Sequence, residues 1–222
     1  MAESILGKSL LLLYDKYHQG YRLSTKRNID CTIRETREVV KITVISCSLH
    51  PQSRSFVLAR DTVANLQALG AEVTLYDLRT YELPFCDDGP SYDHPHTKEI
   101  NAAIAGAEAV LLAVPIYNFD VNAAAKNLLE LAGDAWNHKL VGFLCTAGGR
   151  NSYMSVMGLA NSLMLDFRCI IIPRFVYAVG SDFGDDRQPT MHVTSPTIKE
   201  RLQQLATATV TLARALDGIT VA

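Results

Sequence analysis

Short runs of β-branched and other apolar residues alternate with longer runs of helical spacing from residue 41 to the end of the chain. The short runs have the composition of strands buried on both faces, and they predict strands at 42–46, 72–76, 109–114, 140–145 and 169–172. Apolar residues that recur every three or four positions predict helices at 54–69, 97–105, 122–132, 153–167 and 197–216. This alternation predicts an α/β fold: a five-stranded parallel sheet with helices on both faces.

Residues 1–40 do not share this alternation, because charged and apolar positions are mixed there without a clear period. We therefore expect two parts, an N-terminal extension at 1–40 and a single α/β domain at 41–222. A domain of that length can bury a full hydrophobic core by itself.

Composition narrows the choice of partner and compartment. The formal net charge of the 222 residues is −2, which provides no basic surface for nucleic acid or anionic lipid. The five cysteines are odd in number and contain no C-x-x-C pair, a pattern that disfavours a disulfide scaffold and a zinc site. The apolar run at 10–13 is too short to span a bilayer. We expect a cytoplasmic protein with a small-molecule partner, no nucleic acid and no membrane.

The first predicted strand runs into a hydroxyl-rich turn that precedes the first predicted helix. The turn contains Ser48, His50, Ser53, Arg54 and Ser55. A helix N-terminus presents unpaired N–H groups and the positive end of the helix dipole, and the serines and the arginine can add further donors. The turn is therefore a candidate phosphate site, although an ordinary capping serine beside a solvated arginine is the simpler alternative.

Two further loops follow the third and fourth predicted strands. One contains Pro115, Ile116, Tyr117 and Asn118, where we expect the proline to end the strand and the aromatic side chains to lie at its tip. The other contains Thr146, Gly148 and Gly149, whose glycines allow close approach of a ligand to the backbone. Ligands of open α/β sheets bind at the carboxyl ends of the strands, so these loops and the serine turn suit a phosphorylated planar heterocycle.

The acidic and histidine residues between 87 and 96 lie in one polar loop, which we interpret as solvated. We expect no metal site in this chain.

Three segments carry a resemblance to a known family: the turn at 47–55, Pro115–Asn118 with the helix after it, and the Gly148–Gly149 pair. Together they resemble the NAD(P)H-dependent FMN reductase family, a flavodoxin-like group that includes quinone and chromate reductases. The resemblance covers about residues 41–175 and implies the strand order 2-1-3-4-5. In the family the first loop reads G-S-x-R-x-x-S-x-N, whereas Cys47, His50 and Ser55 occupy its glycine, arginine and asparagine positions here.

The resemblance implies the cofactor and its residues. The FMN phosphate would be held by Ser48, His50, Ser53, Arg54 and Ser55. The segment from Pro115 to Asn118 would lie along the ring. The loop of Thr146 would reach the pyrimidine edge through Gly148 and Gly149. It further implies hydride transfer from NADPH or NADH to FMN and on to a small acceptor such as a flavin or a quinone. That transfer needs no catalytic side chain, because stacking of the two rings suffices.

The family also implies a homodimer or homotetramer that assembles through the helix at 122–132. Two questions stay open at this point: whether FMN is retained or released, and which nicotinamide nucleotide is preferred. The alternative function is an FMN-binding electron carrier or flavin-dependent binding protein without NAD(P)H oxidation, which the small net charge of −2 disfavours.

Overall fold

The computed structural model describes residues 39–219, so the extension predicted for residues 1–40 lies outside the described residues except for its last two positions. The strands are β1 (Lys41–Ser46), β2 (Glu72–Asp77), β3 (Ala109–Tyr117), β4 (Asp120–Val121), β5 (Leu140–Ala147), β6 (Ile170–Ile171), β7 (Val176–Val179), β8 (Phe183–Gly184) and β9 (His192–Val193). The helices are α2 (Arg54–Ala68), α3 (Pro95–Ala105), α4 (Ala123–Ala132), α5 (Met157–Phe167) and α6 (Pro196–Ala215).

The main sheet has the order β2-β1-β3-β5-β6, and each strand on this path runs parallel to its neighbours. β7 also pairs with β5 in parallel, while β4 folds back antiparallel against β3. If β6 and β7 count as one interrupted strand, the order is the predicted 2-1-3-4-5. The flavodoxin-like α/β fold is therefore confirmed, although the sheet contains seven strands and not five.

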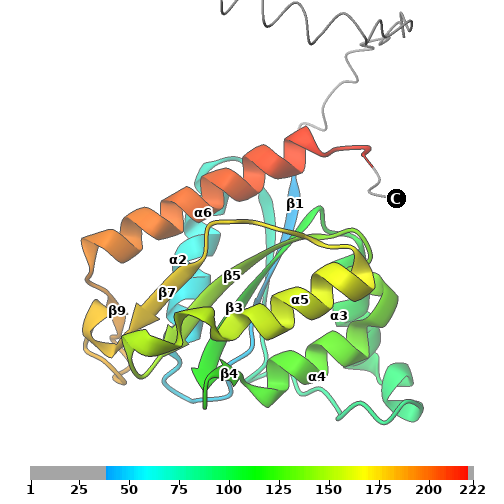
Figure 1. Cartoon of the computed structure of the whole chain (residues 1–222), viewed down its shortest axis with the longest axis horizontal. Coiled ribbons are helices and arrows are strands. Elements are labelled where there is room, and N and C mark those ends of the chain that lie inside the picture. The colour runs from blue at the N-terminus through cyan, green and yellow to red at the C-terminus, as the bar shows by residue number, and fades with distance from the viewer. Residues whose placement is uncertain (1–38, 220–222) are drawn as a thin grey trace, which may run out of the picture. The chain divides into compact units, whose positions relative to one another are not determined.

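Helices cover both faces of the sheet (Figure 1): α2 and α6 lie on one face, and α3, α4 and α5 lie on the other. Side chains alternate between the faces along each strand, so the sheet divides the hydrophobic core into two. The core under α2 and α6 includes Val44, Leu58, Leu111, Leu144 and Leu205. The core under α3, α4 and α5 includes Ile45, Ile100, Leu112, Leu128 and Phe143.

The fifth predicted strand, at 169–172, is only partly correct. The edge strand begins as β6, leaves the ladder near Pro173 and rejoins it as β7, which sequence reasoning missed. Between the two pairings the edge strand has two more residues than β5. Proline has no N–H to donate to a ladder, so the chain bulges there and resumes pairing over four buried residues, Val176–Val179.

The expected end of the third strand is wrong. β3 continues through Pro115 to Tyr117, and Pro115 pairs with Thr146 of β5. Ala113 faces β1, because its carbonyl oxygen accepts the Cys47 N–H at 2.9 Å. Pro115, two residues later, faces the same side, but the pairing of β1 with β3 ends at Ala113. The ladder therefore loses no hydrogen bond because proline lacks an N–H.

The predicted helices are confirmed, with one difference at the fourth. Residues 150–156 wind as a 3₁₀ segment, η3 (Arg150–Val156), and the α-helix begins only at Met157. Within residues 39–219, no helix has the length and apolar character needed to cross a bilayer.

Gly142 gives a test of the packing between β5 and α6. A Cβ at this position would lie 2.6 Å from Leu111 Cδ2 and 3.2 Å from Leu205 Cδ1. Because the interior is already close-packed, we expect Gly142→Ala to lower the free energy of unfolding by about 1–3 kcal/mol, measured by urea denaturation. Gly89→Ala is the control, since its Cβ would meet no atom closer than 3.7 Å; equal stability of the two variants would contradict this packing.

Candidate active site

A cavity of about 480 Å³ lies at the carboxyl ends of β1, β3 and β5. This is the size range of small-molecule sites, at the edge where open α/β sheets bind ligands. Its lining residues are Ser48, Arg54, Pro115, Ile116, Tyr117, Asn118, Thr146, Ala147, Gly148 and Arg187. The three loops singled out from the sequence therefore meet at one cavity, and a fourth segment, around Arg187, joins them.

The N-terminus of α2 provides hydrogen-bond donors beside this cavity. Ser53 is the capping residue, and its hydroxyl accepts the Phe56 N–H at 3.0 Å. The amides of Arg54 and Ser55 come first in the helix and have no acceptor among residues 39–219. The buried Ser48 hydroxyl accepts the His50 N–H at 3.3 Å and keeps its own proton free to donate. These groups form an anion-binding arrangement.

Eight of the twelve predicted site residues line the cavity, and four do not: His50, Ser53, Ser55 and Gly149. The Ser55 hydroxyl is buried against the Thr146 hydroxyl at 2.8 Å. His50 Nδ1 accepts the Gln52 N–H at 3.0 Å from an exposed position. Ser53 and Ser55 thus shape the turn and join it to β5, whereas His50 stabilises the turn from outside.

Arg54 is held by a residue that the sequence did not indicate. Its Nε and Nη2 donate to the two carboxylate oxygens of Asp186 at 2.8 and 2.5 Å. Charge-assisted bonds to both oxygens fix the guanidinium plane, and this pairing lowers the pKa of Asp186 and raises that of Arg54. No acid lies between Ser46 and Arg60 in the sequence, but the fold brings one to Arg54 from a distance of 132 positions.

Gly180 provides the space for this ion pair. A Cβ there would lie 2.6 Å from Arg54 Nη2 and 3.4 Å from Asp186 Oδ2. The backbone of Gly180 therefore packs directly against the paired side chains, and a larger residue would displace them.

The tip of the second loop is a tight hairpin between β3 and β4. Tyr117 pairs with Asp120, and the two turn residues between them, Asn118 and Phe119, have φ of 52° and 62°. Two left-handed residues in succession are typical of a type I′ turn, where asparagine is favourable and phenylalanine is strained. Tyr117 and Phe119 are 50% and 69% exposed at the tip of this hairpin, and Tyr117 lines the cavity.

The glycine loop after β5 is open toward the cavity side. A Cβ on Gly148 or Gly149 would meet no atom within 4 Å, and neither amide has an acceptor in the described part of the chain. The Tyr177 hydroxyl donates to the Gly149 carbonyl at 2.5 Å and anchors the loop from behind. Free N–H groups beside unfilled space are available to the edge of a ligand.

Asn122 connects the first two loops. Its Nδ2 donates to the Cys47 carbonyl at 2.7 Å, and its backbone N–H donates to the Pro115 carbonyl at 3.2 Å. The sequence indicated Asn122 only as the start of a helix. Its buried amide holds the turn at 47–55 and the hairpin after β3 at a fixed separation.

Cys47 and Cys145 lie at strand ends near the cavity, but they are fully buried. Burial raises the pKa of each thiol to about 12. A neutral thiol is a poor nucleophile, so these residues act as small apolar side chains.

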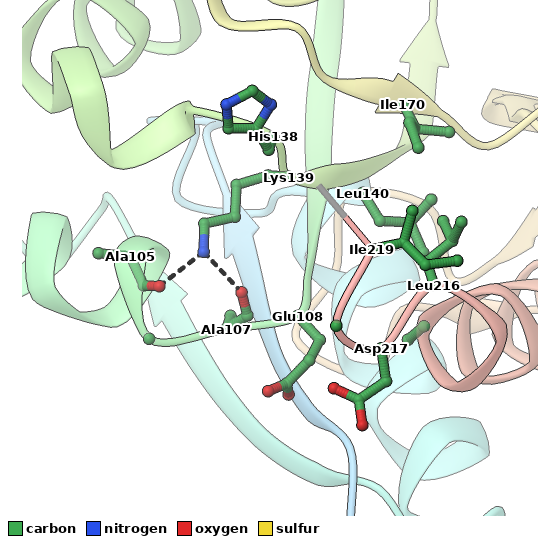
Figure 2. A pocket seen from close by; sticks show the side chains of 13 residues that line it. Ala105, Ala107, Glu108, His138, Lys139, Leu140, Ile170, Leu216, Asp217 and Ile219 are labelled. Carbon is green, nitrogen blue, oxygen red and sulfur yellow. Dashed lines mark hydrogen bonds between the residues drawn. The ribbon is translucent and has the colours of Figure 1, made fainter. Parts of the chain in front are cut away.

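A second cavity, of about 410 Å³, lies at the opposite edge of the sheet beside the first residues of β5 and β6 (Figure 2). Lys139 crosses it and donates from Nζ to the carbonyls of Ala105 and Ala107 at 2.6 and 2.9 Å. Burial lowers the pKa of this lysine. Lys139 satisfies carbonyl groups left without partners near the end of α3, which is a structural task.

Comparison with known proteins identifies the family of this chain. The model of the NADPH-dependent FMN reductase family matches residues 40–184, which include all three predicted loops. The chain belongs to this family.

Individual relatives agree with the family. An NAD(P)H-dependent FAD/FMN reductase of Geobacillus thermodenitrificans is 28% identical over 138 residues, 61% of this chain and 72% of that protein. An NADPH azoreductase of Bacillus sp. strain OY1-2 is 28% identical over 128 residues, 54% of this chain and 72% of that protein. FerB, a flavoenzyme NAD(P)H:(acceptor) oxidoreductase from Paracoccus denitrificans, has the same fold, with a TM-score of 0.64 at 19% identity over 79% of this chain and 98% of that one.

The cofactor of the family is FMN, and the cavity fits it in three respects. The α2 amides and the Ser48 hydroxyl suit a phosphate. The hairpin of Pro115 to Asn118 offers an apolar and aromatic wall for a flat ring system. The free amides of Gly148 and Gly149 suit the polar edge of that ring system.

The Arg54–Asp186 pair gives a test of this geometry by stability alone. Because the folded-state pKa of Asp186 is lowered, the pair stabilises the fold above the ordinary carboxyl pKa of 3.8 and loses that contribution as pH falls through the depressed value. We expect Asp186→Asn to cost about 1 kcal/mol at pH 7, or about 2–4 °C in Tm. By calorimetry, the difference from wild type should shrink below pH 3.8; a difference independent of pH would contradict the pairing.

Proposed function

We propose that the cavity at the carboxyl edge of the sheet holds FMN and that the protein uses it to pass electrons from NADPH or NADH to a small acceptor. The observation that carries this proposal concerns two cavity-lining residues, Arg54 at the start of α2 and Gly148 in the loop after β5. The backbone amides of both have no acceptor among residues 39–219.

In this proposal each loop has a separate task. The phosphate cradle is formed or supported by Ser48, Ser53, Arg54 and Ser55, and His50 fixes the shape of the turn. The ring system is positioned by Pro115, Ile116, Tyr117 and Asn118. Its pyrimidine edge faces the loop that contains Thr146, Gly148 and Gly149. Bound FMN supplies the chemistry of hydride acceptance and donation.

The side chains position the reactants and do not move protons. The charged side chains in the cavity lining are the guanidiniums of Arg54 and Arg187, which stay protonated at neutral pH. Backbone N–H groups of the glycine loop stabilise negative charge that develops at the polar edge of the ring system. The rest of the rate enhancement comes from holding two flat molecules in contact.

The acceptor we propose is a small planar molecule, such as a flavin, a quinone or an azo compound. Tyr117 lines the cavity, and its half-exposed ring suits a flat molecule that enters after the nicotinamide leaves. Relatives named as a FAD/FMN reductase and an azoreductase support this class of acceptor.

We also propose a cytoplasmic homodimer or homotetramer. Four cysteines of the described residues are free thiols, as in a reducing compartment. Asn127 of α4 ties down the loop at 84–86, since its amide bonds the Cys86 N–H and the Pro84 carbonyl at 2.8 and 2.9 Å. That loop presents Phe85, which is 80% exposed beside α4, and such an exposed aromatic suits an interface.

The reductase function is tested by anaerobic titration of the FMN-loaded protein with NADPH and then with NADH. We expect rapid loss of the flavin absorbance with at least one nucleotide, because the open rim admits the nicotinamide. If FMN binds and neither nucleotide bleaches it, the protein is an electron carrier or a flavin-dependent binding protein.

The assembly is tested by light scattering. We expect a mass of two or four times 24.4 kDa and a lower mass for Phe85→Glu, because a charge at that position would be buried in the interface. Leu165→Glu is the control, since Leu165 on α5 is 75% exposed. A wild-type mass of 24.4 kDa, or equal masses for Phe85→Glu and wild type, would contradict an interface at α4.

A further inference from the structure

The turn at 47–55, which is the phosphate turn of the proposed function, lacks a basic side chain at the place where the family resemblance implies one. His50 stands at the arginine position of the motif, and its ring is engaged with the Gln52 N–H on the exposed side of the turn. Arg54 has two of its three nitrogens on Asp186. These two residues therefore bring little net positive charge to a phosphate dianion.

Arg187 lies in the same cavity and comes from a different part of the chain. It lines the cavity with Ser48 and Arg54, and its Nη1 donates to the Gln52 carbonyl of the phosphate turn at 2.6 Å. It follows the last residue matched by the family model, residue 184. The three charged side chains Arg54, Asp186 and Arg187 together add one positive charge to this end of the cavity.

The local backbone and the charges around Arg187 both indicate a constrained position. Its φ is 63°, a left-handed conformation that is costly for residues other than glycine. Its N–H bonds the Met191 sulfur at 3.4 Å. Burial and the nearby charge of Arg54 lower the pKa of the Arg187 guanidinium, and the Asp186 carboxylate acts in the opposite direction. Two guanidiniums thus share one carboxylate at partial burial, and a bound anion would stabilise the remaining positive charge.

We propose that Arg187 binds the phosphate of FMN, in the place of the arginine that the first loop lacks. This inference rests on the proposed function, since it requires FMN in this cavity. Arg187 adds the second guanidinium to the cradle, and its bond to the Gln52 carbonyl orients it toward the turn. The loop at 185–191 then forms part of the cofactor site.

The experiment compares binding of FMN with binding of riboflavin, which lacks the phosphate, by flavin fluorescence titration. Wild-type protein should bind FMN at least tenfold more tightly than riboflavin. Arg187→Ala and Arg187→Gln should both weaken FMN binding at least tenfold, about 1.4 kcal/mol, and leave riboflavin binding within twofold. Arg187→Lys should retain most of the preference, because the charge remains although the forked donor is lost.

Arg60→Ala is the matched control. It removes one arginine from α2 that is paired with its neighbour Asp61 on the surface, so FMN and riboflavin binding should both stay at the wild-type level. Melting temperatures of all variants, measured without flavin, separate loss of binding from loss of folding.

The outcomes distinguish this inference from the proposed function. If wild-type protein binds FMN no better than riboflavin, the phosphate cradle itself is wrong. If wild type prefers FMN and Arg187→Gln keeps that preference, Arg187 only stabilises the turn through its bond to the Gln52 carbonyl, and the inference is overturned. If Arg187→Ala weakens FMN and riboflavin binding equally, its role is structural, which also overturns the inference.

Discussion

The unequal lengths of three paired strands create the site. β1 makes its last pairing with β3 at Ser46 and Ala113, whereas β3 continues to Tyr117 and pairs with β5 as far as Pro115 and Thr146. The parallel register fixes this step, because slipping a strand by one residue would turn its apolar side chains toward the wrong core. The cavity lies beside the step, and the chain that leaves β1 enters the N-terminus of α2 there.

Connections between loops keep that edge in one arrangement. Asn122 joins the turn after β1 to the hairpin after β3, and the Ser55 and Thr146 hydroxyls join α2 to β5. Tyr177 anchors the glycine loop from β7. Because catalysis by a bound flavin depends mainly on positioning, these hydrogen bonds are as important to the proposed function as the groups that face the cavity.

The sequence predicted the fold and three of the four segments at the cavity, because these depend on local patterns. Strand-like runs such as 109–114 and the hydroxyl-rich turn before the first helix are visible in a few neighbouring residues. The course of β3 beyond Pro115 was missed because it depends on which neighbour the proline nitrogen faces. Asp186 and Arg187 were missed for a similar reason: nothing local to 185–188 indicates that the fold returns this loop to Arg54, 132 positions earlier.

The most direct test of the account is a crystal structure of the protein with FMN bound. The account predicts the phosphate within hydrogen-bond distance of the Arg54 and Ser55 amides, with the pyrimidine edge at Gly148 and Gly149. Density for the flavin at the opposite edge of the sheet, beside Lys139, or a phosphate directed away from the N-terminus of α2, would contradict it.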